Sequence, residues 1–219
     1  MSVVSGIGQS DVGRRLGRTG LDLQQLANDP EALREQSRRT KRAELRLTAW
    51  HNQVSKPVIA AVNGTCAGGG LHFVADADIV IAGGSAVFLD PHVSVGQVTA
   101  YEAIALVRKS PMEPIVRMAL AGRHERVDAA RARQLGICSE VVDDGRLRER
   151  AQELGELIAR NSPAAMAATK RALWGALEHG LTEACRRGAR ELVGLWGHPD
   201  QTEGPLAWAE RREPRWETS

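Results

Sequence analysis

Three consecutive glycines, Gly68, Gly69 and Gly70, are the feature of the sequence best suited to chemistry. Glycine lets the backbone approach a ligand closely and adopts dihedral angles that other residues avoid. The triplet lies between a predicted buried strand and a predicted helix, so it falls at a helix N-terminus, where N–H groups lack internal partners and the helix dipole is positive. An N–H donated from there to a carbonyl oxygen would stabilise an enolate or a tetrahedral oxyanion. Close packing of the helix on the strand, without any ligand, explains the triplet equally well.

Short apolar runs around the glycines predict the strands that would position them. Continuous apolar runs of this length are typical of strands buried on both faces. They occur at residues 57–62, 78–82, 86–89 and 137–142.

Helical patterns dominate from about Thr99 onward. One helix is predicted to begin at Asp128 and to close at Gly136. Residues 145–212 predict three or four amphipathic helices, with breaks near Ser162-Pro163, Gly180 and residues 197–199. Strands that alternate with helices and are followed by a helical region predict an α/β fold.

The first 53 residues give weaker signals. Residues 1–19 lack periodicity and predict a flexible arm, and Gly6-Ile-Gly8 begins a dinucleotide fingerprint that Asp11 interrupts, so NAD binding would depend on an incomplete motif. Asp29-Pro30 predicts a helix start, and a mostly solvated helix is expected to continue to about Gln53. Its basic run at 38–42 is expected either to face solvent or to bind a phosphate group.

Composition excludes several classes of partner. The chain has 219 residues, 42% of them hydrophobic and 26% charged, and a net charge of +2, which gives no reason to expect a nucleic acid or an anionic membrane as partner. Its three cysteines show no metal-ligand spacing, so we expect no metal and free thiols in a reducing compartment. No apolar run approaches the roughly 20 residues of a membrane span, and no signal peptide is recognisable at the N-terminus. A cytoplasmic protein is expected.

Several blocks in register resemble the enoyl-CoA hydratase/isomerase (crotonase) superfamily. The most specific run comprises Lys56 to Gly64, then Ala67-Gly68-Gly69-Gly70, then Ala75 to Ala82. The similarity extends from about Gly20 to Trp216. Further matching blocks are residues 88–91, 95–96, 120–123, 129–136 and 203–212.

The resemblance implies a crotonase-like ββα spiral core followed by a C-terminal helical trimerisation region. It divides the chain into an atypical N-terminal segment at 1–19, the spiral core at 20–142 and the helical region at 143–219. The family has several strands before the first matching motif, so we expect a core that is shortened at its start. The implied assembly is a homotrimer or homohexamer.

The resemblance also implies an oxyanion hole. One donor is the N–H of the middle glycine, Gly69, and the other is the N–H of Leu21, because Gly20-Leu21-Asp22-Leu23 resembles the Ala-Gly-x-Asp-Leu motif of the family. Gly20, Gly68 and Gly70 are the backbone neighbours expected to contact the substrate. Asp22 is expected to be structural.

Both catalytic glutamates of the family hydratases are replaced here by histidines, His72 and His92. An imidazole titrates near pH 6.5 and can move protons, and two that face one pocket repel when both are charged, which lowers one pKa. The alternative is that they fill the pocket without catalysis. Asp90 and Glu102 are the nearby carboxylates that could serve as the base, and Glu102 is expected either to do so in contact with the substrate or to lie on a helix surface.

Near the C-terminus the resemblance places Trp208 and Arg211 where they would reach the coenzyme A bound by a neighbouring subunit, through adenine stacking and a phosphate contact. Burial of Trp208 in an oligomer contact is the alternative. The remaining histidines show no partner pattern and are expected at the surface or at helix ends, namely His51, His124, His179 and His198.

The expected function is an enzyme of acyl-CoA metabolism, in which the oxyanion hole polarises a thioester carbonyl and stabilises an enolate. Coenzyme A enters as part of the substrate, and no separate cofactor is expected. Hydration of an enoyl-CoA, double-bond isomerisation and hydrolysis of a thioester or β-keto bond are all compatible with the residues. A non-catalytic acyl-CoA-binding or oligomer-partner protein is the alternative from another class.

Overall fold

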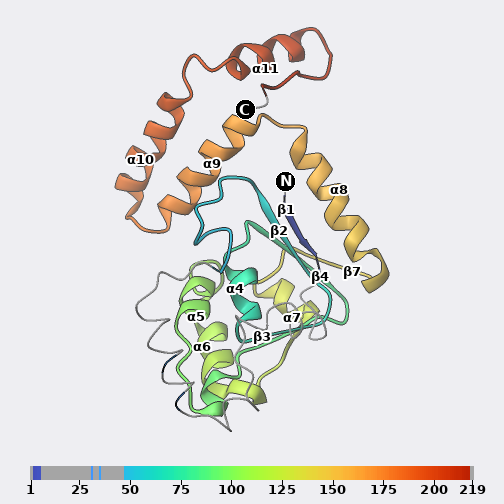
Figure 1. Cartoon of the computed structure of the whole chain (residues 1–219), viewed down its shortest axis with the longest axis vertical. Coiled ribbons are helices and arrows are strands. Elements are labelled where there is room, and N and C mark those ends of the chain that lie inside the picture. The colour runs from blue at the N-terminus through green and yellow to red at the C-terminus, as the bar shows by residue number, and fades with distance from the viewer. Residues whose placement is uncertain (1, 6–30, 32–34, 36–46, 218–219) are drawn as a thin grey trace. The chain divides into compact units, whose positions relative to one another are not determined.

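The computed structural model describes residues 2–5, 31, 35 and 47–217 of the chain (Figure 1). The chain divides into two compact units. The N-terminal unit comprises Val3–Val54 and Ile59–Ala151, and the C-terminal unit comprises Met1–Ser2, Ser55–Val58 and Gln152–Ser219.

The described strands form two small sheets. In the first sheet the strand order is β1-β2-β4-β7, and β2 pairs parallel with β4, which pairs parallel with β7. In the second the order is β3-β5-β6, with β3 parallel and β6 antiparallel to β5. The bounds are β1 Ser2–Ser5, β2 Val58–Val62, β3 Thr65–Ala67, β4 Ile79–Gly83, β5 Val87–Leu89, β6 Val127–Asp128 and β7 Glu140–Val142.

The parallel strands β2 and β4 carry the apolar core next to the glycine triplet. All five residues of β2 are buried, and its Ala61 lies opposite Ile81 of β4. A strand buried on both faces requires apolar side chains on both, which is why its sequence is continuously apolar rather than alternating. The strands predicted at 57–62, 78–82, 86–89 and 137–142 are confirmed as β2, β4, β5 and β7.

Short helices surround these sheets. The N-terminal unit holds α4 Gly70–Ala75, α5 Tyr101–Leu106, α6 Met112–Ala121, α7 Ala129–Gln134 and the 3-10 turns η1 His92–Val95, η2 Gly122–His124 and η3 Asp144–Arg146. The predicted limits of α7 are confirmed: the carboxylate of Asp128 accepts a hydrogen bond from the N–H of Arg131 at 2.7 Å, and Gly136 after the helix has φ +74°. Only glycine adopts that angle at little cost.

The helix predicted to continue to about Gln53 is wrong at its C-terminal end. Glu31 and Glu35 are helical, but residues 48–53 form turns, and Gln53 has a positive φ of 53°. The physical cause is Thr48, whose buried hydroxyl bonds to Asp76 and holds the chain in a turn that a continuing helix could not make. The rest of that predicted helix, the segment 1–19 and the Gly6-Ile-Gly8 motif lie largely or wholly outside the described residues.

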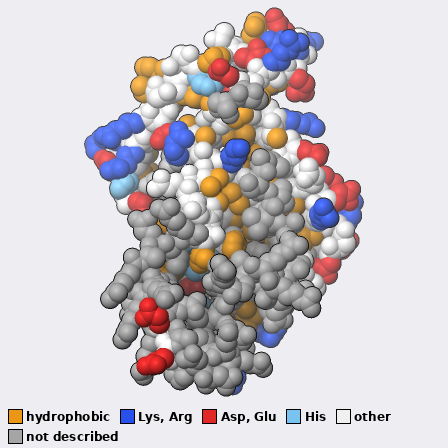
Figure 2. Space-filling view, in the orientation of Figure 1, with side chains coloured by type: hydrophobic (Ala, Val, Ile, Leu, Met, Phe, Trp, Pro, Cys, Tyr) orange, Lys and Arg blue, Asp and Glu red, His pale blue; other side chains and the backbone are white. Residues whose placement is uncertain are grey.

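The C-terminal helices confirm the prediction for residues 145–212. Their bounds are α8 Leu147–Ala159, which starts in the N-terminal unit, α9 Pro163–Ala176, α10 Leu181–Gly194 and α11 Asp200–Ala209. Ser162 caps α9 by accepting a hydrogen bond from the N–H of Ala165 at 3.1 Å. Helices α9 and α10 pack side by side (Figure 1), and Arg171 pairs with Glu191 across them at 2.7 Å. Figure 2 shows basic and acidic side chains together over α10 and α11.

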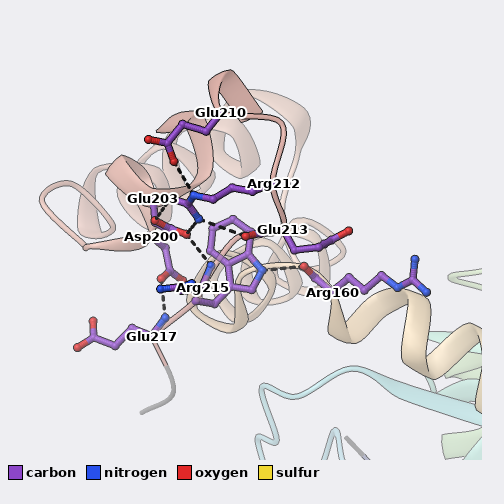
Figure 3. Close-up of polar contacts among 9 residues, drawn as sticks. Arg160, Asp200, Glu203, Glu210, Arg212, Glu213, Arg215 and Glu217 are labelled. Atoms are coloured by element: carbon purple, nitrogen blue, oxygen red, sulfur yellow. Dashed lines mark hydrogen bonds and ion pairs between the residues drawn. The ribbon is translucent and has the colours of Figure 1, made fainter. Parts of the chain in front are cut away.

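The chain after α11 folds back and is held by charged groups (Figure 3). Glu203 of α11 accepts two hydrogen bonds from the guanidinium of Arg212, at 2.6 and 3.0 Å, and one from the N–H of Arg215 at 2.6 Å. Asp200 accepts from the N–H of Glu217 at 2.9 Å, and the indole of Trp216 donates to the carbonyl of Arg160 at 2.7 Å. We call residues 210–217 with these anchors the C-terminal latch.

Across the described residues, none of the helices has both the length and the apolar character that a bilayer span requires.

Candidate functional site

The glycine triplet forms the turn between β3 and α4. Gly68 has φ +50°, a conformation that favours glycine, and its N–H donates to the carbonyl of Leu89 in β5 at 3.4 Å. Gly69 occupies the N-cap position of α4 with φ −55° and ψ −20°, and no side chain among the described residues caps this helix end. Gly69 is exposed whereas Gly68 and Gly70 are buried. The backbone at Gly69 is therefore accessible at the positive end of the helix dipole.

His72 lies in the first turn of α4, immediately after the glycines. Its side chain is 7% exposed, and its Nε2 lies 3.1 Å from Oε1 of Glu102, which is 8% exposed. Glu102 belongs to the first turn of α5, and α5 packs against α4. The packing of these two helices therefore joins residues that are thirty positions apart in the sequence. Glu102 is buried in the site, not on a helix surface.

His92 begins η1 on the other side of the glycine turn. A Cβ added to Gly68 would lie 3.7 Å from Cε1 of His92, so the imidazole packs against the turn. Its Nδ1 lies 2.5 Å from Oδ1 of Asp90, and its backbone N–H donates to the same oxygen at 3.2 Å. Its Nε2 lies 3.8 Å from Oε1 of Glu102. One carboxylate oxygen of Glu102 thus faces both imidazoles.

The carboxylates set the charge of this site. Burial alone would raise the pKa of Glu102, but the hydrogen bond from His72 and attraction to both imidazoles outweigh it and lower that pKa. The hydrogen bond to Asp90 raises the pKa of His92 despite burial, and attraction to Asp90 and Glu102 adds to the effect. The sequence suggested that two imidazoles would repel and lower one pKa. At His92 the pKa shift is upward because the hydrogen bond to Asp90 and attraction to Asp90 and Glu102 outweigh burial.

A third imidazole lies beside His72. The ring centroids of His51 and His72 are 6.0 Å apart. The hydroxyl of Thr48 donates to Asp76 at 2.6 Å and lies 2.6 Å from Nδ1 of His51, so it accepts from an Nδ1–H because its own hydrogen is already donated. Burial lowers the pKa of His51, attraction to Asp76 opposes this, and repulsion from His72 adds to it. His51 is a partnered residue, so its prediction as a surface histidine is wrong.

The site residues predicted from the sequence fall into three groups. His72, His92, Glu102 and the glycine turn come together as described above. The second oxyanion donor, Leu21, and its neighbour Gly20 lie outside the described residues. Trp208 and Arg211 belong to the C-terminal unit, where both are exposed, Trp208 to 87%.

Sequence reasoning missed the group of Thr48, His51 and Asp76. Asp76 lies in the most specific block of the resemblance. In the structure it is only 5% exposed, and a buried carboxylate requires a polar partner. That partner, Thr48, is 28 residues upstream, and no local pattern marks it. His198 is likewise partnered, because its Nδ1 accepts from the N–H of Asp200 at 3.2 Å. Within the described part of the chain, no group of three or more His, Cys, Asp or Glu is arranged to hold a metal ion.

The sequence pattern of the enoyl-CoA hydratase/isomerase family matches residues 16–219. A probable mitochondrial enoyl-CoA hydratase of Dictyostelium discoideum is 34% identical over 173 residues, which are 78% of this chain and 62% of that protein. Carnitinyl-CoA dehydratase of Proteus mirabilis is 34% identical over 74% of this chain and 64% of its own length. The chain therefore spans less than two thirds of each of these relatives.

Solved structures give the same result. An enoyl-CoA hydratase/isomerase from Mycobacterium paratuberculosis superposes with a TM-score of 0.72 at 42% identity, over 74% of this chain and 64% of that one. A subunit of an enoyl-CoA hydratase from Geobacillus kaustophilus superposes with a TM-score of 0.77 at 27% identity, over 92% of this chain and 76% of that one. A glycine turn at a helix N-terminus on a small parallel sheet, followed by stacked helices, is the crotonase-like α/β fold. The chain belongs to the enoyl-CoA hydratase/isomerase family.

Proposed function

We propose that the chain acts on an acyl-CoA thioester through an enolate held in an oxyanion hole. The single observation that carries this proposal is the carboxylate of Glu102 shared by the imidazoles of His72 and His92, directly beside the glycine turn. Those three side chains can take and return protons within reach of a carbonyl bound at Gly69. The relatives named above are an enoyl-CoA hydratase and a carnitinyl-CoA dehydratase, and we extend the CoA-thioester substrate class of those names to this chain.

In the proposed reaction, the N–H of Gly69 donates to the thioester oxygen, and the resemblance supplies Leu21 as the second donor. Donors aimed at this oxygen favour the enolate because negative charge develops there in the transition state. The polarised carbonyl makes the α-proton acidic and the β-carbon of an enoyl-CoA electrophilic. The imidazoles and Glu102 then transfer protons at these carbons. Hydration of an enoyl-CoA and double-bond isomerisation both follow this course, and neither needs a cofactor beyond the coenzyme A of the substrate.

The proposal extends to assembly and location. We propose a homotrimer or homohexamer, in which Trp208 and Arg211 of one subunit reach the coenzyme A of its neighbour. The exposure of both side chains supports this, because neither is engaged in the core of its own unit. A cytoplasmic location is proposed on the sequence features given above.

The first test is a panel of enoyl-CoA and β-ketoacyl-CoA thioesters assayed for any product. It is paired with NMR detection of deuterium exchange at the α-carbon of butyryl-CoA in D₂O, which requires only an enolate. We expect exchange in the wild type and its loss, by about 10²–10⁴-fold, in His72→Ala and His92→Ala. The exposed His124→Ala is the matched control and should exchange normally.

Two outcomes would count against the proposal. Tight binding of butyryl-CoA with neither product nor exchange would identify a binding protein. Exchange that survives unchanged in both histidine variants would refute the assignment of protons to these imidazoles.

A further inference from the structure

The pair formed by Asp90 and His92 carries an inference that rests on the proposed function. We propose that Asp90 is a positioning residue that fixes the proton of His92 on Nδ1, so that His92 acts through Nε2 as the proton donor of the site. The base is then the pair on the other side, His72 with Glu102. This assigns opposite roles to two histidines that the sequence presents as equivalent.

The geometry at Asp90 leaves the imidazole little freedom. One oxygen, Oδ1, accepts both from the backbone N–H of His92 at 3.2 Å and from its Nδ1 at 2.5 Å. The two residues are separated only by Pro91, whose ring restricts its φ, here −85°. The side chain of His92 is thus tied at its backbone and at its ring to a single atom. Rotation about χ1 or χ2 would break the shorter of these bonds.

Burial fixes the charge of Asp90. Its side chain is 1% exposed, and a carboxylate in such a place is stable only when it is hydrogen-bonded to a donor. The hydrogen bonds from His92 outweigh burial and lower the pKa of Asp90, so it is ionised and can only accept. Nδ1 of His92 therefore bears a hydrogen in both the neutral and the charged ring. The proton that His92 gains or loses is the one on Nε2.

The surroundings favour the form of the ring that carries this second proton. The pKa of His92 is raised by the hydrogen bond to Asp90, and the carboxylate of Glu102 on α5 acts in the same direction. The elements packed most closely against η1 are α6 and η2. Their charged side chains all lie at or near the surface, with Glu113, Arg117, Arg123 and His124 exposed and Glu125 half-buried and paired with Arg117. Asp90 and Glu102 are the charged groups that raise the pKa of His92, and His72 contacts the same oxygen of Glu102.

With His92 as proton donor and His72 with Glu102 as base, the protons and electrons of the reaction balance. The base, at Glu102 or His72, takes a proton from carbon and the C–H electrons enter the enolate. Collapse of the enolate then forms a new C–H bond with the Nε2 proton of His92, and the N–H electrons remain on an imidazole that is neutral and still protonated at Nδ1. In hydration, the base takes its proton from water instead. A proton returned from Glu102 to His92 would restore the starting state, and because their atoms are 3.8 Å apart a water between them would relay it.

The test uses Asp90→Asn, with Asp128→Asn as a matched control outside the site. Asp128 caps α7, and an asparagine there still accepts the capping hydrogen bond, so this variant removes one carboxylate charge without touching His92. Proton and ¹⁵N NMR of the imidazoles follows the titration and tautomer of His92 in each protein. In Asp90→Asn we expect the titration of His92 to move to lower pH and the fixed Nδ1–H to be lost. Asp128→Asn should titrate like the wild type.

Kinetics supply the second readout. A donor must be protonated, so activity is lost as the pH rises through the pKa of His92. In Asp90→Asn this alkaline loss of activity should begin at lower pH. The value of kcat should fall by about 10²–10⁴-fold with little change in KM. If the role of Asp90 were purely structural, Asp90→Asn would lower the amount of folded enzyme but would not shift the alkaline side of the pH–activity profile.

The outcomes separate this inference from the proposed function. An unchanged His92 titration in Asp90→Asn would overturn the inference whatever the activity. A shifted titration in a protein that turns over no thioester would retain the inference and reject the proposed function. If Asp90→Asn does not fold, the wild type alone decides, because neutral His92 observed with its hydrogen on Nε2 and not on Nδ1 would refute the role of Asp90.

Discussion

At the scale of single residues, the buried carboxylates determine what the imidazoles can do. The side chains of Asp90, Asp76 and Glu102 are each at most 8% exposed, and each contacts a hydroxyl or an imidazole. A buried carboxylate without a donor would be protonated and chemically inert at neutral pH. Its partner keeps it charged, and it in turn orients that partner. The acid–base chemistry of the site therefore belongs to pairs of residues rather than to the histidines alone.

The role of Gly69 as an oxyanion donor can be tested by removing one hydrogen. Its φ of −55° is one that proline adopts, so Gly69→Pro deletes the N–H with little change at this residue, whereas Gly69→Ala retains it. We expect kcat to fall by about 10²–10³-fold in the proline variant, as for other single oxyanion donors, and by much less in the alanine variant. Steady-state kinetics with an active thioester, together with circular dichroism of both variants, provides the measurement. Equal losses in the two would mean that the N–H is not used.

The sequence predicted some site residues and not others for a clear reason. His72 and the glycines lie in one continuous segment, and His92 follows a recognisable block, so local pattern and resemblance find them. The sequence left Glu102 open between the site and a helix surface, and the packing of α5 on α4 places it in the site. His51 was missed because it is held through the bond from Thr48 to Asp76. Contacts between distant segments depend on tertiary packing, which a single sequence does not reveal.

At the scale of elements, α4 is held at both ends. The glycine turn fixes its N-terminus, and at its C-terminus the ammonium of Lys109, just after α5, donates to the carbonyls of Val74 and Ala77, the former at 3.3 Å. A cation is favoured at the negative end of a helix dipole. Because Lys109 follows the helix that carries Glu102, this contact supports the spacing between Glu102 and His72. Local sequence patterns do not indicate it.

We expect Lys109 to make the free energy of unfolding increase as the pH rises. Burial lowers the pKa of Lys109 to about 8, against attraction to Asp78 and Asp76, whereas a lysine in an unfolded chain titrates near about 10.4. Between these values the unfolded chain binds more protons, so the free energy of unfolding rises with pH, by at most about 1.4 kcal/mol per pH unit from this group. The neutral amine still donates to both carbonyls.

Denaturant unfolding of the wild type and of Lys109→Met at pH 7, 8, 9 and 10 would test this. We expect the stability of the wild type relative to the variant to increase from pH 8 to pH 10. A relative stability that stays constant or decreases over this range would contradict the assignment of a lowered pKa to Lys109.

The C-terminal latch gives a second prediction at this scale. The hydrogen bonds from Arg212, with that from the N–H of Arg215, lower the pKa of Glu203 to about 2. A lowered carboxyl pKa means that the latch is intact above about pH 4 and is lost only as the pH falls toward 2. At neutral pH, Glu203→Gln should speed amide exchange at Arg215 and Trp216 by about three- to tenfold, because the paired charge is gone.

Hydrogen-exchange mass spectrometry of the peptides covering 210–219 measures this effect. Glu213→Gln, which changes an exposed glutamate of the same segment, is the control and should exchange like the wild type. Accelerated exchange that extended to α9 would indicate general unfolding of the unit and not release of the latch.

The elements were largely predictable because their signals are local. Continuous apolar runs predicted β2, β4, β5 and β7, the cap at Asp128 marked the start of α7, and the break near Ser162-Pro163 preceded α9. The turn at 48–53 was missed because its cause, the bond from Thr48 to Asp76, is not local. The same distinction between local and distant contacts explains which site residues the sequence predicted and which it missed.

At the scale of the whole molecule, the sequence resemblance correctly predicted the family and the fold. The homotrimer or homohexamer that it also implies stays a proposal. The exposed apolar side chains of the C-terminal unit are where that proposal can be tested. They include Leu181, Leu192, Trp196 and Trp208, which are 60–87% exposed. Scattered exposed apolar residues are normal in a monomer, so exposure by itself does not identify an interface. A test needs a readout that connects one of these side chains to the ligand.

Trp208 offers such a readout because the proposal gives it a specific target, the nucleotide end of coenzyme A on a neighbouring subunit. Trp208→Ala should raise KM for an acyl-CoA by about three- to tenfold, the range expected for loss of one aromatic stacking contact. KM for the matching acyl-N-acetylcysteamine thioester, which lacks the nucleotide, should not change. Trp196→Ala, which removes a second indole that is 67% exposed, should leave both KM values near those of the wild type. Light scattering coupled to size exclusion gives the mass of each protein and shows whether assembly is retained. A trimeric or hexameric Trp208→Ala variant with unaltered KM for the acyl-CoA would rule out the contact with coenzyme A, and a monomeric wild type that is fully active would rule out a site shared between subunits.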